Sequence, residues 1–172
     1  TVLGASIKMA FRLFEANGKL RESEAHYRTM FESTGSSMIL VEEDMSISMM
    51  NEEFARQVGY PPEEIIGRRK WTEFVHPDDR QQMIGQHRMR RESPEYAQPS
   101  YEFRYLTRSG ETRHGLITVG MLPGTKRSIA SIINITDRCR ADAELENKNE
   151  ELTAANRELM ANARRAEMRP CR

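Results

Sequence analysis

The side chains most able to ligate a metal are His76, Asp79 and His87. Imidazole nitrogens and carboxylate oxygens are ligands that zinc and related metals accept. However, all three lie in or beside one short helical stretch, and one helix face rarely completes a coordination shell. His76 precedes a helix-starting proline, where an exposed or capping role is usual, and His87 lies in the polar stretch GQHRMRR. We therefore expect no metal site, and we expect His26 and His114 at the surface.

Motifs for enzymatic chemistry are missing from the sequence. There is no glycine-rich phosphate loop, no GxSxG elbow and no HExxH pair. The two cysteines, Cys139 and Cys171, form no CxxC pair, which fits a reducing, cytoplasmic setting. Lys plus Arg and Asp plus Glu both total 26, so no net charge draws the chain to nucleic acid or to an acidic membrane. We expect a regulatory module without catalytic residues.

The two ends of the chain are predicted to be helical, because residues 1–60 and 124–169 contain no proline. An apolar stripe predicts a helix over about 5–33, and it consists of Ala10, Leu13, Leu20, Tyr27 and Phe31. Charged residues interrupt this helix well before the roughly 20 apolar residues that a membrane span needs. We expect no transmembrane segment here.

Short apolar runs between these ends are typical of strands. The stretch SMILVEEDMSISMMN, residues 37–51, reads as a β-hairpin whose turn lacks the usual glycine. Three more strands are predicted near 100–107, 112–121 and 127–136, with turns at RSGE and PGTK. The five strands are expected to form one small antiparallel sheet.

Three short helices are predicted between the second and third strands. Asn51 can cap a helix that Gly59 ends, two prolines can start a second helix that ends at Gly67, and Pro77 can start a third that runs to about Arg91. Short helices bury little alone, so they must cover one face of the sheet as a lid. Four apolar side chains can turn inward: Phe54, Val58, Ile65 and Ile66.

A cavity between this lid and the sheet is the candidate binding site. Tyr101, Phe103 and Tyr105 alternate with Glu102 and Arg104, so the aromatic face is expected to be buried and the charged face to be solvated or ion-paired. The candidate lining consists of Trp71, Phe74, Met83, Phe103, Tyr105, Ile117 and Val119. The alternative is that these residues simply fill the core, because no convergent charged group marks a ligand.

The C-terminal stretch predicts a coiled coil, because Leu145, Leu152 and Leu159 repeat at heptad spacing. If the leucines occupy position d, Asn149 and Asn156 fall at position a; if they occupy a, the d positions are also half polar. Buried asparagine weakens a dimer but fixes its register. We expect a marginal parallel homodimer through residues 137–168.

Together, the element order and several short motifs resemble the PAS domain over residues 22–136. The matching pieces are Asn51 with Phe54, GY at 59–60, EEIIG ending at Gly67, HPDD at 76–79, RSG at 108–110 and NITD at 134–137. The family more often has D-I-T where this chain has N-I-T. Asn134 can accept and donate hydrogen bonds, but it cannot form the ion pair of a carboxylate.

This resemblance implies an α+β PAS fold with a five-stranded antiparallel sheet, an N-terminal linker helix (1–35), a sensory domain (36–136) and a C-terminal coiled-coil signalling helix (137–172). Flavin-binding light sensors of the family need a reactive cysteine in the lid, and residues 50–95 contain none. Haem-binding members use an axial ligand such as histidine, which leaves His76 and His87 as weak candidates. The identity of any cofactor is left unknown.

The function that we expect is sensing and relay within a longer, multidomain signalling protein. A small ligand or partner would change the packing of lid and sheet, and the junction Asn134, Ile135, Thr136 and Asp137 would pass the change to the exit helix and a downstream output domain. The parent is expected to be a sensor histidine kinase, cytoplasmic in this segment and with a membrane anchor elsewhere left open. The alternatives are a ligand-free dimerisation spacer and a regulatory module of a diguanylate cyclase.

Overall fold

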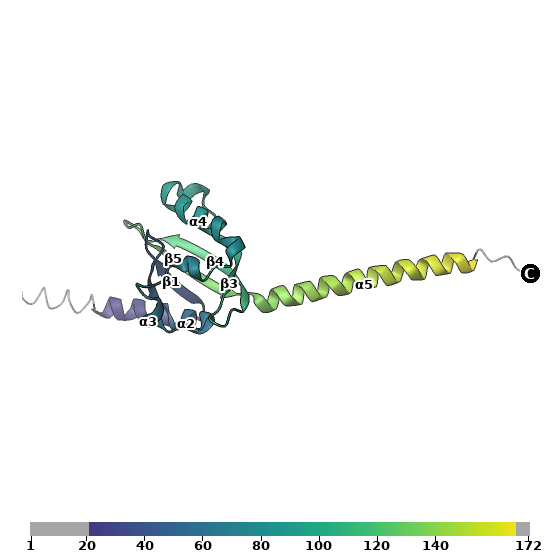
Figure 1. The fold of residues 1–172 in the computed structure, drawn as a ribbon, viewed down its shortest axis with the longest axis horizontal. Coiled ribbons are helices and arrows are strands. Elements are labelled where there is room, and N and C mark those ends of the chain that lie inside the picture. Colours follow the sequence, from purple (N-terminus) through teal and green to yellow (C-terminus); the bar gives the residue numbers. More distant parts are fainter. Residues whose placement is uncertain (1–20, 168–172) are drawn as a thin grey trace, which may run out of the picture. The chain divides into compact units, whose positions relative to one another are not determined.

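The computed structural model describes residues 21–167, and these fall into two compact units that divide between Ile133 and Asn134. The first unit begins with a helix over residues 21–33 and continues into a sheet with its helical cover (Figure 1). Three residues of the predicted N-terminal stripe, Ala10, Leu13 and Leu20, lie outside the described part of the chain. The remaining two residues differ in burial, since Tyr27 is largely exposed and Phe31 is half-buried.

The sheet has five strands in the order β2-β1-β5-β4-β3, and its registered pairs run antiparallel. Its strands are β1 (Ser37–Val41), β2 (Ile47–Met50), β3 (Ser100–Leu106), β4 (Thr112–Met121) and β5 (Ser128–Asn134). All five predicted strands are confirmed. The last one ends two residues earlier than predicted, because Thr136 already belongs to a helix.

The turn between β1 and β2 explains how a hairpin forms without glycine. Met45 adopts the left-handed conformation with φ of 74°, which non-glycine residues rarely do. Asp44 supports this turn, because its Oδ1 accepts hydrogen bonds from Ser46 N (3.0 Å) and Ser46 Oγ (2.6 Å). These hydrogen bonds lower the pKa of Asp44. The side chain of Asp44 thus replaces the missing glycine as the turn signal.

Short helices cover one face of the sheet (Figure 1). They are α2 (Glu52–Val58), α3 (Pro62–Ile65), the 3-10 helix η1 (Trp71–Glu73), α4 (Pro77–Glu92) and a second 3-10 helix, η2 (Pro94–Tyr96). The predicted caps of α2 are confirmed: Asn51 Oδ1 accepts from Phe54 N at 3.1 Å, and Gly59 ends α2 with φ of 80°. The predicted end of the next helix at Gly67 was wrong, because α3 ends at Ile65 with Ile66 as its C-cap. The two 3-10 helices were not predicted.

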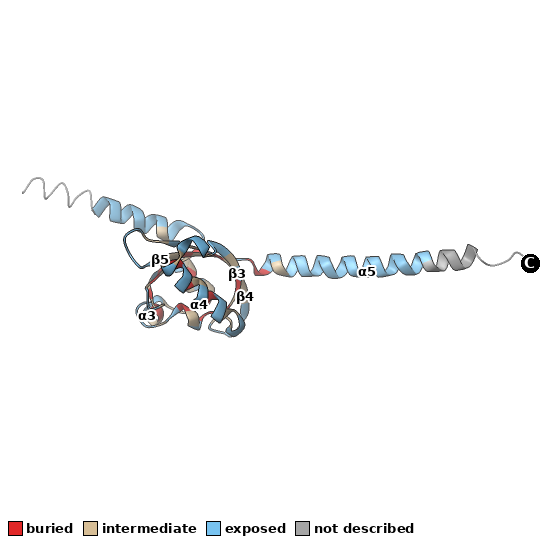
Figure 2. Ribbon diagram, turned by 90° about the horizontal axis from the view of Figure 1, so that it is seen from above, coloured by how far each residue is buried: buried red, intermediate tan, exposed pale blue. Residues whose placement is uncertain are grey.

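The core lies between this lid and the sheet, where the buried residues gather (Figure 2). Phe54, Val58 and Ile65 turn inward as predicted, but Ile66 is 40% exposed. The prediction for Ile66 was wrong because α3 is only four residues long and ends before it. Gly115 allows β3 and β5 side chains to meet, since a Cβ there would lie 2.8 Å from Phe103 Cε1.

The second unit consists of the helix α5 (Thr136–Glu167). Residues 140–160 of α5 are all exposed within the single chain (Figure 2). Leu145, Leu152 and Leu159 are 61%, 62% and 66% exposed. No helix in the described part of the chain is both long and apolar enough to cross a membrane.

Candidate functional site

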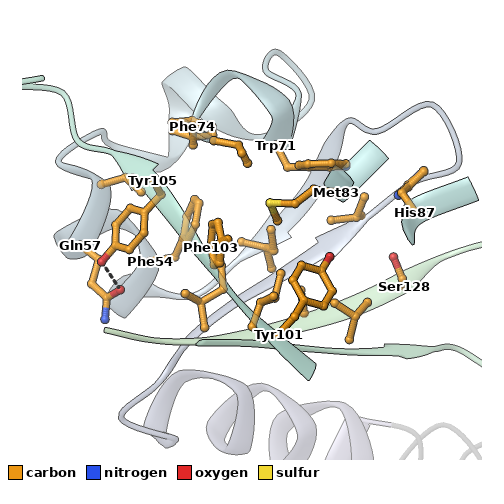
Figure 3. A pocket seen from close by; sticks show the side chains of 18 of the residues that line it. Phe54, Gln57, Trp71, Phe74, Met83, His87, Tyr101, Phe103, Tyr105 and Ser128 are labelled. Carbon is orange, nitrogen blue, oxygen red and sulfur yellow. Dashed lines mark hydrogen bonds between the residues drawn. The ribbon is translucent and has the colours of Figure 1, made fainter. Parts of the chain in front are cut away.

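A cavity of about 60 Å³ lies inside the first unit, between the lid and the inner face of the sheet (Figure 3). Its walls come from α2, η1 and α4 on the lid side and from β1, β3, β4 and β5 on the sheet side. This volume exceeds the roughly 10–15 Å³ that one water molecule needs. It is far below the roughly 300–1,000 Å³ typical of pockets for drug-sized ligands. The cavity therefore has room for a molecule of only a few non-hydrogen atoms.

All seven residues of the predicted lining lie on the cavity wall: Trp71, Phe74, Met83, Phe103, Tyr105, Ile117 and Val119. Six of them are buried, and Val119 is partly buried against the same core. Their placement follows from the alternation along β3 and β4 and from the inward side of the lid. Whether they bind a ligand stays a prediction.

One end of the cavity is aromatic and uncharged. There Tyr105 OH donates a hydrogen bond to Gln57 Oε1 at 3.3 Å, and both side chains lie together in Figure 3. Phe54 and Phe74 pack edge to face with ring centroids 5.8 Å apart. Burial raises the pKa of Tyr105, so its hydroxyl keeps its proton at neutral pH. The polar groups at this end, Tyr105 OH and Gln57 Oε1, already form a hydrogen bond with each other.

The opposite end carries His87, Tyr101 and Ser128, which lie away from Tyr105 in Figure 3. Arg90 joins them, because it lines the same cavity and contacts the Tyr101 hydroxyl. His87, Arg90 and Ser128 are all buried, and the ring centroids of His87 and Trp71 are 5.7 Å apart. The arginine of the cavity wall thus lies at this end, with three polar side chains beside it.

Charge and burial set the protonation states at this end. Burial lowers the pKa of His87, and the neighbouring Arg91, Arg90 and Arg88 lower it further, although the hydrogen bond to the Glu43 carbonyl opposes them. That bond joins His87 Nε2 and Glu43 O at 3.2 Å. His87 is therefore neutral at pH 7, with its Nε2–H donating.

His87 is buried although it lies in a polar stretch of the sequence. It is 6% exposed and belongs to the cavity wall, because α4 turns this side toward the sheet while Arg88 and Met89 face outward. His76 is confirmed as a cap, since its Nδ1 accepts from Asp78 N at 3.4 Å. In the described part of the chain, no three His, Cys, Asp or Glu side chains cluster to hold a metal ion.

Haem and flavin, the cofactors considered from the family resemblance, do not fit this cavity. A volume of about 60 Å³ is far smaller than either group needs. The Nε2 of His87, one candidate axial ligand, is engaged by the Glu43 carbonyl. No cysteine lines the cavity wall. We derive no chemistry through either cofactor.

Two charged contacts fasten α4 to the sheet. Asp79 accepts from Arg104 three times, through Arg104 N (2.7 Å), Nε (3.1 Å) and Nη2 (2.6 Å), which lowers the pKa of Asp79. Arg104 thus forms ion pairs with the lid carboxylates Asp79 and Asp78, which the sequence did not indicate. At the other end, Arg91 donates to the carbonyls of Lys126 (3.1 Å) and Glu42 (3.4 Å).

The predicted junction residues lie where β5 leads into α5. Asn134 Oδ1 accepts from Thr136 N at 2.9 Å and from Thr136 Oγ1 at 2.6 Å. Asp137 stands in the first turn of α5 and pairs with Arg140 at 3.7 Å. Asn134 therefore supports the helix start by hydrogen bonding, without the ion pair that a carboxylate could add.

Sequence reasoning missed the polar end of the cavity. Arg90, Tyr101, Ser128 and Gln57 line the cavity in addition to the predicted residues. Tyr101 could have been included from its alternation with Phe103, and Arg90 lies one helical turn beyond His87 and two beyond Met83. A cationic residue on the same helix face as Met83 was the available signal.

Comparison with known proteins adds one family match, because residues 47–119 match a family model described as "PAS fold". Three solved structures are similar at low identity. One is the PAS domain of an HTR-like protein from Haloarcula marismortui, 21% identical with a TM-score of 0.55, covering 70% of this chain and 98% of that one. Another is a sensory box histidine kinase/response regulator from Burkholderia thailandensis E264, 23% identical with a TM-score of 0.55, covering 74% and 98%.

The third is a PAS domain from a LuxR-family transcriptional regulator of Burkholderia thailandensis, solved in complex with ethanol. It is 20% identical with a TM-score of 0.51, covering 63% of this chain and 96% of that one. At these identities the likenesses establish the fold.

Proposed function

Because the chain contains a PAS domain, we propose that it is the sensory module of a multidomain signalling protein and that a small ligand or partner acts on its cavity. The observation that carries this proposal is the path of β5. Ser128, Ala130 and Ile132 of this strand line the cavity, and only Ile135 separates the end of β5 from the start of α5. A change in the cavity wall therefore reaches the exit helix along one strand.

The relay would use the four junction residues. Asn134 holds the first turn of α5 through Thr136, so a shift of β5 would move the hydrogen-bonding group that starts the helix. Ile135 connects the two elements, and Asp137 is favourable near the positive end of the helix dipole. A two-state change in helix register needs a bias of only a few kcal/mol, which a modest input can supply.

The output side of the proposal is a parallel homodimer through α5. Leu145, Leu152 and Leu159 form one heptad row and are all more than 60% exposed in the single chain. A second copy of α5 would cover this row. The polar residues between the leucines, Asn149 and Asn156 in one register, would fix the alignment and keep the coil marginal. A marginal coil can change register when its input changes.

The parent protein that fits best is a sensor histidine kinase, with a diguanylate cyclase as the second choice. The likeness to a sensory box histidine kinase/response regulator supports the first. The module itself would act in the cytoplasm, binding neither nucleic acid nor membrane, because its positive and negative charges balance. Its output domain would follow α5 in the parent chain.

Sedimentation of the full chain against a chain ending at Asp137 tests the dimer. We expect the full chain to sediment as a dimer and the shorter one as a monomer. The substitution Leu152→Ala should weaken the dimer, whereas Lys148→Ala, which removes only an exposed pair with Glu144, should not. Equal masses for the full and shortened chains would exclude α5 as the main contact.

A ligand-free dimerisation spacer is the second candidate function, favoured by the small volume and the mainly apolar wall of the cavity. Native mass spectrometry of the purified protein separates the two, because a sensor should release or take up a small molecule. A chain that takes up none, and whose dimer is unchanged by every added compound, would be the spacer.

A further inference from the structure

Arg90 is a buried cation without a carboxylate partner. Its side chain is 7% exposed and lines the cavity. It donates hydrogen bonds to backbone carbonyls, from Nη2 to Gln98 O (2.6 Å) and from Nη1 to Gln86 O (3.5 Å). Among residues 21–160, whose side chains the structure describes, no Asp or Glu forms an ion pair with Arg90. Carbonyls use some of the five guanidinium donors but neutralise none of the charge, and such burial is costly.

Other hydrogen-bond donors lie on the same cavity wall. Trp71 Nε1 is buried and has no hydrogen-bond partner, although buried indole N–H groups usually find one. Tyr101 contacts Arg90, and burial raises the pKa of Tyr101, so the hydroxyl keeps its proton. The ring of Trp71 packs beside that of His87. His87 and Arg90 are one helical turn apart on α4. The cavity wall thus carries three donor side chains, Trp71, Arg90 and Tyr101, of which Arg90 and Tyr101 are in contact.

The rest of the cavity limits the size of a ligand and favours an apolar group at the end of the ligand that lies away from the donors. Val41, Met83 and Ile117 give apolar walls beyond the donors. The volume of about 60 Å³ admits a few non-hydrogen atoms. A carboxylate matches the planar guanidinium in shape and charge, and a short alkyl group suits apolar walls.

We infer that the cavity binds a short-chain monocarboxylate, with its carboxylate on Arg90, Trp71 and Tyr101 and its alkyl group toward Met83. This inference rests on the proposed function, because it names the chemical class of the ligand for the same cavity. It explains both the unneutralised guanidinium and the unpartnered indole. A carboxylate would supply the counter-ion that Arg90 lacks and the acceptor that Trp71 Nε1 lacks.

Trp71 is the only tryptophan of the chain, so its fluorescence reports on this wall directly. The experiment titrates the full chain with propionate and with propionamide, its neutral analogue of nearly equal size, at constant ionic strength. Calorimetry serves as a second measurement. We expect propionate to bind at least about tenfold more tightly than propionamide, as for a hydrogen bond to a charged group.

Matched variants locate the effect. Arg90→Met keeps the length of the side chain and removes its charge, and it should abolish the preference for propionate. Arg88→Met removes an exposed charge on the same helix and should leave the preference intact. Tyr101→Phe should weaken propionate binding by a smaller factor. If Arg90→Met does not fold by circular dichroism, Arg90→Lys, which keeps the charge but loses the planar fork, should show a reduced preference.

The possible failures are distinct. Equal affinities for propionate and propionamide, or a preference unchanged in the Arg90 variants, would overturn the carboxylate inference and leave small-molecule sensing intact. If propionate, propionamide and ethanol all fail to bind by both measurements, the carboxylate inference falls together with the ligand-binding part of the proposed function.

Discussion

The two ends of helix α4 are attached to the sheet by different chemistry. At its start, the carboxylate of Asp79 neutralises Arg104 and also accepts from the Arg104 backbone N–H. Near its end, His87 and Arg90 donate hydrogen bonds to backbone carbonyls, and no carboxylate among the described residues pairs with Arg90. Arg91 also donates to a carbonyl, and its charge is stabilised by the nearby Glu43 carboxylate. The arginine at the start of α4 is thus neutralised by a carboxylate, whereas the buried Arg90 near its end is not, and this is the property expected of a binding site.

The largest loss of stability should come from a substitution at the start of α4. We expect Asp79→Ala to lower the free energy of unfolding by about 2 kcal/mol, because it removes a charge-assisted contact and leaves the backbone N–H of Arg104 without its acceptor. Urea unfolding measures this change. The control is Asp78→Ala, whose side chain is 67% exposed and which should cost far less. Equal losses in both variants would mean that Asp79 is an ordinary surface pair.

A smaller loss should follow from Arg91→Met at the other end. Arg91 ties α4 to the β1–β2 turn through Glu42 O, to the β4–β5 turn through Lys126 O and to Ser128 Oγ. Removing these contacts should cost about 1 kcal/mol. Hydrogen exchange should show faster opening near Lys126. Arg88→Met, at an exposed position on the same helix, should change neither quantity.

The fold was largely predictable because its signals are local. Asn51 and Gly59 mark the ends of α2 by capping chemistry, and the alternation of Phe103 with Arg104 sets the buried face of β3. The apolar part of the cavity followed from the same alternation. Such signals depend on neighbours in the sequence, so they can be found without coordinates.

The polar end was not predictable in the same way, because its meaning depends on contacts distant in the sequence. GQHRMRR contains three arginines in seven residues, which usually indicates a solvated face. Only the packing of α4 against β3 and β5 separates buried His87 and Arg90 from exposed Arg88. The positive φ of Met45 was equally hidden, since no sequence rule favours methionine in that conformation.

Acid should weaken the attachment of the end of α4 to the sheet, because it protonates His87. Its pKa in the folded chain lies below the usual 6.5, first because of burial and then because of the arginines around it. The unfolded chain therefore binds the proton more readily, and the stability that neutral His87 contributes is full above about pH 6.5 and is lost as pH falls through the folded pKa.

The measurement compares urea midpoints at about pH 7.5 and about pH 5.5 for the wild type and for His87→Gln. We expect a smaller drop in midpoint for the variant, and a difference smaller than the effect of Arg91→Met. An identical drop in both proteins would show that His87 does not contribute to the pH dependence.

Arg90→Met should change stability least, and this contrast with Asp79→Ala is the sharpest test of the comparison. The substitution removes contacts to the Gln98 and Gln86 carbonyls, but it also removes the cost of burying a charge without a counter-ion. These terms oppose each other, so the net change in the free energy of unfolding should lie within about 1 kcal/mol. A loss comparable to that of Asp79→Ala would show that Arg90 is a structural clamp for the η2 segment. A near-neutral change means that the guanidinium is kept for something other than stability, and the cavity that it lines is where that role would be exercised.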